Sequence, residues 1–300
     1  MNKLFKVLIF LALLWCVSYL AASLMFDGDV VSTGDKVVVI PIEGMITLNG
    51  GGTLFSSSAS GEDIVNKIET AESDSNVKAI VLEINSPGGT VLGSKIVADK
   101  VQSVEKPVVA VITESGTSGA YWIASQADAI VADELSIVGS IGVIGSYLEF
   151  SGLLDIYNVS YQRLVTGQYK DISSPYKEMT SDEEELIQER LDVIHDYFVA
   201  QVAAGRNMTY VEVADLSDGL FYLGLECKEL GLVDEFGDLD YAVEYAKGLA
   251  GIEDGSVSEY TEESTLFDRL KGYIAYSSFY IGQGLGSVLV SSGDSWEIKV

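Results

Sequence analysis

Strand-like and helix-like segments alternate along the middle of this 300-residue chain, and the alternation limits the folds open to it. The helical segments carry apolar residues on one face, whereas the strand-like runs are short, apolar and β-branched. The predicted strands are Lys36–Ile42, Ala79–Ile84, Pro107–Ile112 and Ala129–Ala132, and the helices between them are Glu62–Ser73 and Val91–Ser103. Alternation at this spacing predicts βαβ units, and therefore an α/β fold whose mostly parallel sheet is covered by helices.

Three glycine-containing motifs follow predicted strands. They are Asn85–Gly89, Gly116–Gly119 and Gly139–Gly145. Ligand sites on parallel sheets lie at the carboxyl ends of the strands, so we expect the functional site where these motifs meet. The glycine- and serine-rich stretches at residues 49–52 and 56–61 are expected to form a flexible loop instead.

Ser118 is the candidate nucleophile. It stands between a glycine-containing turn and the apolar run that begins the next predicted helix. At a helix N-terminus, unpaired backbone N–H groups and the helix dipole favour developing negative charge. An ordinary helix N-cap is the alternative role, and this motif alone leaves both open.

A serine nucleophile needs a base, and histidine is scarce here. The one histidine, His195, lies beside the apolar stripe of a predicted helix that begins at Ser181 and ends at Gly205. We expect it to be a helix residue with satisfied hydrogen bonds. Lys170 is therefore the candidate base, although a loop lysine taken alone is far more often an ordinary surface residue. An amine accepts a proton only when it is neutral, so this role requires that Lys170 be desolvated when the protein assembles.

Composition excludes several classes of function. The net charge of −27 argues against nucleic-acid binding. Two cysteines, Cys16 and Cys227, are too few for a disulfide framework, and both are interpreted as structural. The turn at Pro87–Gly89 lacks the pattern and the lysine of a phosphate-binding loop. We expect no metal and no cofactor.

The N-terminus predicts a membrane anchor over residues 1–28. Lys3 and Lys6 precede an apolar run, Val7–Phe26, that is long enough to cross a bilayer as a helix. Positive charge before the run places the N-terminus inside and the rest of the chain outside the cell, as a single-pass membrane protein. A cleavable signal peptide that ends near Ala21–Ser23 is the alternative.

The motifs, taken in order, resemble the short form of signal peptide peptidase A. The resemblance covers Val37 to Ala250, within a predicted domain at residues 36–250. It rests on the segments Asn85–Gly89, Thr117–Ala124, Gly139–Val143, Tyr169–Asp171 and Asp218–Asp234. One departure is Ala120, where the family usually has a second glycine, and its methyl group could narrow the approach to the nucleophile.

The resemblance implies a Clp-protease/crotonase-type fold and a Ser–Lys peptidase acting on remnant signal peptides and other apolar peptides in or near the membrane. Ser118 would be the nucleophile and Lys170 the base, with the Ser140 hydroxyl orienting the Lys170 amine. A backbone N–H from Gly88 or Gly89, helped by that of Gly119, would hold the oxyanion.

In short family members the lysine comes from a neighbouring subunit of a ring, so the resemblance implies a homo-oligomer, an octamer. Three alternatives remain open at this point. They are a membrane serine protease of the stomatin-operon type, a crotonase-like acyl-CoA enzyme, and a non-enzymatic membrane scaffold. Residues 251–300 are predicted to be a tail, in which an acidic linker precedes an apolar, interfacial or protein-packed segment at Tyr273–Val290.

Overall fold

The computed structural model describes residues 34–53, 56–253 and 255–260, together with Phe5, Leu13–Trp15 and Ser18. The predicted anchor helix at Val7–Phe26, Cys16 and the apolar tail segment at Tyr273–Val290 therefore lie almost entirely outside the described residues. Within the described ranges, no helix has both the length and the apolar character needed to cross a membrane.

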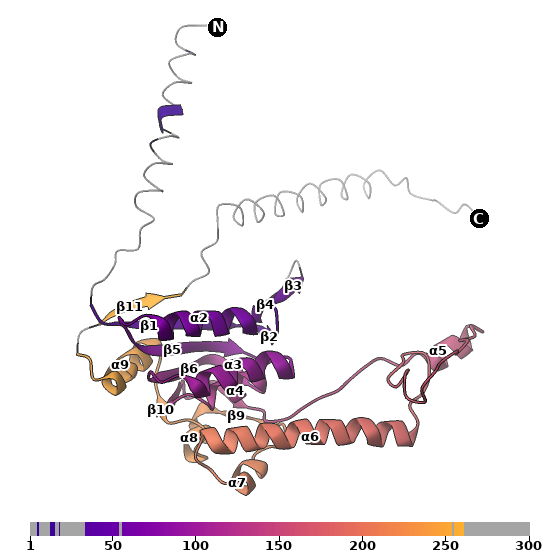
Figure 1. Cartoon of the computed structure of the whole chain (residues 1–300). Helices are drawn as coiled ribbons and strands as arrows, with labels where there is room; N and C mark the ends of the chain where they lie inside the picture. The colour runs from indigo at the N-terminus through magenta and orange to yellow at the C-terminus, as the bar shows by residue number, and fades with distance from the viewer. Residues whose placement is uncertain are drawn as a thin grey trace, which may run out of the picture. The chain divides into compact units, whose positions relative to one another are not determined.

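A mostly parallel sheet forms the centre of the fold (Figure 1). Its strands run in the order β10-β7-β6-β5-β1-β11, and every neighbouring pair in this order is parallel. Strand β8 pairs in parallel with β6, and β9 pairs antiparallel with β8. The bounds are β1 Lys36–Glu43, β5 Val77–Ser86, β6 Val108–Thr117, β7 Ala129–Ala132, β8 Ile137–Gly139, β9 Phe221–Leu223, β10 Glu235–Phe236 and β11 Ser256–Glu259. The α/β fold predicted from the alternation is confirmed.

The strands are apolar on both faces because helices cover both. Val38 and Ile40 of β1 lie in the core beneath α2 (Gly61–Ser73), α3 (Val91–Ser103) and α4 (Gly119–Ala124), whereas Val37 and Val39 pack with α9 (Leu239–Ala250) on the other face. Side chains alternate between the faces of a strand, so a continuous run of valine and isoleucine serves both cores.

The glycine- and serine-rich stretch after β1 differs from the flexible loop that the sequence predicts. Strands β2 (Met45–Thr47), β4 (Ser56–Ser60) and β3 (Gly51–Thr53) form a small second sheet in that order. Backbone pairing needs no apolar side chains, so weak patterning did not reveal these strands. Ser60 then accepts a hydrogen bond from the Asp63 N–H and caps α2.

The predicted helix that begins at Ser181 and ends at Gly205 is confirmed as α6, with a capping box between Thr180 and Glu183. Just after it, Arg206 forms a bidentate ion pair with Asp234, which also accepts a hydrogen bond from the backbone of β7. These contacts fix the end of α6 to the sheet. The remaining short helices are α5 Ser151–Ile156, α7 Tyr210–Ala214 and α8 Gly224–Glu229.

Candidate active site

Three strand ends bring the glycine-containing motifs together. Strand β6 pairs in parallel with β5 and with β8, so that Ser86 lies opposite Gly116 and Gly139 opposite Thr117. The residues that follow these strands are the Pro87–Gly89 turn, Ser118 and Ser140. They lie at one edge of the sheet, where the sequence predicts the site.

Ser118 occupies the turn between β6 and α4 in a strained conformation, with φ 52° and ψ −124°. A non-glycine residue with positive φ is uncommon and is concentrated at functional sites. Its N–H donates to the Gly139 carbonyl at 2.7 Å, and its carbonyl accepts from the Trp122 N–H at 3.0 Å. Ser118 stands at the N-cap position, yet its side chain forms no capping hydrogen bond. The hydroxyl is therefore not used to stabilise the helix.

Ser118 opens onto a cleft of about 550 Å³. Its lining includes Gly89, Gly119 and Ser140, which follow the strand ends, together with residues of α6. Polar side chains such as Gln188 and Asp192 line the cleft together with apolar ones. The apolar ones include Val91, Trp122, Val143, Leu191 and Phe198. The cleft can therefore accept an extended peptide with apolar side chains beside the serine hydroxyl.

The two turn glycines differ in their relation to the cleft. The N–H of Gly88 donates to the Ser86 hydroxyl at 3.1 Å, and Gly88 is not among the lining residues. Gly89 lines the cleft with Gly119, and a Cβ at Gly89 would lie 1.8 Å from the Ile46 carbonyl oxygen. The close packing at Gly89 admits no side chain, so this backbone can approach a ligand closely.

Ser140 lies beside Ser118 in the lining, with φ 50°. Its hydroxyl donates to the Gly219 carbonyl at 2.9 Å and its N–H donates to the Leu220 carbonyl at 3.0 Å. A hydroxyl that donates its proton still has lone pairs with which to accept from an amine. Ala120, by contrast, is buried in the core and does not line the cleft.

His195 also lines the cleft, which the sequence analysis did not anticipate. Gln188, Leu191, Asp192 and His195 share one face of α6 at helical spacing, and that pattern was the available signal. The Nε2 atom of His195 lies 3.0 Å from the Ser217 carbonyl oxygen. Because a carbonyl only accepts, Nε2 must carry a proton and cannot take one from Ser118.

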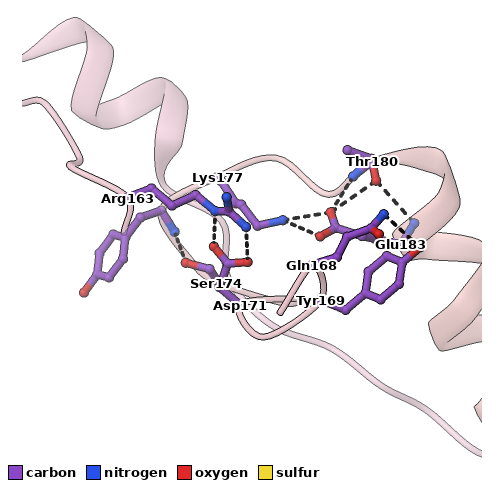
Figure 2. Close-up of polar contacts among 9 residues, drawn as sticks. Arg163, Gln168, Tyr169, Asp171, Ser174, Lys177, Thr180 and Glu183 are labelled. Carbon is purple, nitrogen blue, oxygen red and sulfur yellow. Dashed lines mark hydrogen bonds and ion pairs between the residues drawn. The ribbon is translucent and has the colours of Figure 1, made fainter. Parts of the chain in front are cut away.

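Lys170 is exposed and lies outside this cleft. It belongs to the long connection between β8 and α6, residues 140–180, which also carries α5 (Figure 1). Its neighbour Asp171 is held by Arg163, whose Nη2 lies 2.8 Å from the Asp171 Oδ1 (Figure 2). This hydrogen-bonded pair lowers the pKa of Asp171. Asp171 is thus paired with Arg163 rather than with Lys170.

Within one chain, the cleft is therefore lined by four of the predicted site residues, Ser118, Ser140, Gly89 and Gly119. Lys170 lies outside it. The described ranges contain no group of three histidine, cysteine or acidic residues that could hold a metal. Cys227 is buried and reduced, and burial raises the pKa of its thiol to about 12, as expected of a structural residue.

A parallel α/β sheet with an accessible serine on a strained strand-to-helix turn is the arrangement of a serine hydrolase. Residues 100–253 match the model of peptidase family S49, and residues 53–130 match that of the Clp proteases. The chain belongs to peptidase family S49, as a serine peptidase similar to signal peptide peptidases, and its fold is of the Clp-protease/crotonase type.

Similar proteins span bacteria and archaea. The chain is 32% identical to a predicted protease of Methanocaldococcus jannaschii over 96% of both chains. It is 34% identical to a predicted signal peptide peptidase SppA of Enterococcus faecium, over 79% of this chain and 70% of the relative. It is 30% identical to protease 4 of Haemophilus influenzae, over 77% of this chain and 38% of that one. The expected family and the expected peptidase activity are confirmed, in preference to an acyl-CoA enzyme or a scaffold.

Proposed function

We propose that this peptidase is anchored in the cell membrane and hydrolyses remnant signal peptides and other apolar peptides in or near the membrane. The observation that carries this proposal is the Ser118 hydroxyl, which makes no capping hydrogen bond, on a strained turn that faces a cleft with apolar side chains in its lining. Lys3, Lys6 and the apolar run that follows support an anchor with an internal N-terminus and an extracytoplasmic peptidase domain.

The chemistry is acyl transfer. The Ser118 oxygen attacks the peptide carbonyl, and the resulting oxyanion accepts hydrogen bonds from the Gly89 and Gly119 amides, both of which belong to residues lining the cleft. Lys170, in its neutral form, takes the serine proton and returns it to the leaving amine. A water molecule then attacks the acyl group on Ser118. Lys170 takes a proton from this water and returns it to the Ser118 oxygen, so the acyl group leaves as a carboxylic acid.

Lys170 reaches Ser118 only from a neighbouring subunit in this proposal. Two features of the 140–180 connection support it. Lys170 lies outside the cleft of its own chain, and the connection exposes large apolar side chains. Ile144 is 91% exposed, Leu148 73%, Ile156 79% and Leu164 98%. Burying this surface against a second copy would remove apolar area from water and desolvate Lys170, which favours its neutral form.

The test uses the full-length chain and a fluorophosphonate probe, which labels activated serines. We expect the wild-type protein and Ser115→Ala to be labelled and to hydrolyse an apolar peptide ester. Ser115 is a matched control because it lies three residues earlier on β6, and its hydroxyl donates to the Ser86 carbonyl instead. Ser118→Ala should lose both properties and keep its thermal unfolding midpoint. Labelling or turnover that persisted in Ser118→Ala would reject Ser118 as the nucleophile.

A further inference from the structure

Ser94 presents a buried hydroxyl that has no hydrogen-bond partner. It lies on α3 and is 1% exposed, and its backbone N–H donates to the Thr90 carbonyl at 3.0 Å. Its Oγ forms no hydrogen bond with any described residue. Ser94 is nevertheless one of the residues that line the same cleft as Ser118, and its Oγ lies just beneath the surface of that cleft, with less than 1 Å² exposed.

The Ser94 hydroxyl adjoins both glycines whose amides line the cleft. A Cβ built on Gly119 would lie 2.1 Å from the Ser94 Oγ and 3.3 Å from the Gly89 nitrogen. These short distances place the hydroxyl against the Gly119 backbone, near the Gly89 amide. The hydroxyl therefore lies close to the residues whose amides would bind a carbonyl oxygen in the cleft.

The other buried serines of the described part of the chain all donate hydrogen bonds. Ser86 donates to the Gly44 carbonyl, Ser125 to Trp122, Ser136 to Ile112 and Ser217 to Val213. Burying a hydroxyl without a partner is unfavourable, and an alanine would avoid that cost. A buried donor that faces a cleft is satisfied when the ligand supplies the acceptor.

We propose that the Ser94 hydroxyl donates a hydrogen bond to the carbonyl oxygen of the bound peptide, beside the amides of Gly89 and Gly119. This inference rests on the proposed role of Ser118. As Ser118 attacks, the carbonyl oxygen becomes negative and the hydrogen bond from Ser94 strengthens, so the group stabilises the transition state more than the bound substrate. Ser94 itself neither forms nor breaks a covalent bond.

The experiment compares Ser94→Ala with Ser125→Ala in the full-length chain. Ser125 is an equally buried serine at the end of α4, but its hydroxyl donates to the Trp122 carbonyl and does not line the cleft. We expect Ser94→Ala to lower kcat by about 100-fold at nearly constant KM, as for the loss of one oxyanion donor. Its unfolding midpoint should be equal to or above that of the wild type, because no hydrogen bond is lost, whereas Ser125→Ala should lower the midpoint and keep kcat.

A peptide aldehyde gives a second readout. Its adduct with Ser118 carries an oxyanion-like oxygen, so its inhibition constant should rise in Ser94→Ala in parallel with the loss of kcat. Ser94→Cys, which keeps the shape of the side chain with a somewhat larger atom and a much weaker donor, should behave like Ser94→Ala. A loss of less than threefold in kcat, or an unchanged aldehyde constant, would reject the role of Ser94 while leaving that of Ser118 intact. Activity retained in Ser118→Ala would instead reject both.

Discussion

The backbone N–H of Ser118 donates to the carbonyl oxygen of Gly139 at 2.7 Å. The bond ties the turn after β6 to the residue that precedes Ser140, and both serines have positive φ angles. The backbones of both serines are thus held by main-chain contacts between neighbouring strand ends, and the Ser140 hydroxyl also donates to the Gly219 carbonyl. Replacing the Ser118 side chain should therefore leave the turn geometry in place, so that a loss of activity reports on chemistry.

Gly89→Ala should damage the fold around the cleft. The new Cβ would lie 1.8 Å from the Ile46 carbonyl oxygen, and the backbone on either side is held by pairing with β2. We expect a loss of several kcal/mol, on the scale of about 3 kcal/mol for overpacking, together with loss of turnover. Thermal unfolding and peptide-ester hydrolysis measure the two effects.

Gly248→Ala is the matched control for that variant. Gly248 lies within α9, and nothing stands within 4 Å of the Cβ that alanine would add. Alanine is the better helix former by about 1 kcal/mol, so this variant should be slightly more stable than the wild type with full activity. Equal stability of the two alanine variants would show that the turn at Gly89 yields more readily than the packing indicates.

The start of α6 should loosen in acid. The Lys177 amine lies 2.7 Å from Oε1 and 2.8 Å from Oε2 of Glu183, which also completes the capping box with Thr180 (Figure 2). These hydrogen bonds, chiefly that from Lys177, lower the pKa of Glu183 below its ordinary value of 4.5. Because the pKa of Glu183 is lower in the folded protein than in the unfolded chain, its charge stabilises the fold at pH values above the unfolded-state pKa. This stabilisation is lost as the pH falls through the folded-state pKa.

Hydrogen exchange measured at neutral pH and below pH 4.5 checks this prediction. Amides in the first turn of α6 should lose protection as the pH falls, before the amides of β5 and β6 do. Lys177→Met removes the larger cause of the lowered pKa of Glu183, so it should weaken protection at neutral pH and flatten the dependence on pH. Identical pH profiles for Lys177→Met and the wild type would contradict the assignment.

His195→Gln should leave the pH dependence of turnover unchanged. Activity should rise with pH, because only a neutral amine accepts the Ser118 proton. The Nε2 of His195 is hydrogen-bonded to the Ser217 carbonyl oxygen, and the amide of a glutamine side chain can donate a similar hydrogen bond. Rate profiles of the two proteins, recorded with one apolar peptide ester, make the comparison. A rising limb that vanished in His195→Gln would transfer the role of base to the histidine.

The sequence predicted the central sheet and the placement of Ser118 because both follow from local patterns. β-Branched runs define strands that helices cover on two faces, and glycines mark the turns at their ends. The role proposed for Ser94 could not be predicted, since it depends on the closeness of Ser94 on α3 to Gly119 on α4. The same holds for His195, which lines the cleft because α6 packs against α4, where Phe198 stacks on Trp122.

The sequence also could not predict where Lys170 lies relative to the cleft, because the connection at residues 140–180 that carries it has little apolar periodicity. Lys170 is exposed in the single chain, so an active site shared between two subunits stays a prediction. The β-strand at Ser256–Glu259, within the predicted tail, was missed for a different reason. Its sequence is polar, and it is held by backbone pairing with β1.

Mixing two inactive variants tests whether neighbouring subunits share the site. Ser118→Ala keeps Lys170, and Lys170→Ala keeps Ser118, so each should be inactive alone. After subunit exchange, random assembly in a ring gives both intact residues at about one junction in four, and activity should return to about that fraction of wild type. Two affinity tags carried by different variants verify co-assembly. Mixing Ser118→Ala with the double variant is the control, since no junction then holds an intact serine. Absence of recovery in rings that carry both tags would place Ser118 and Lys170 in one subunit and overturn the shared site.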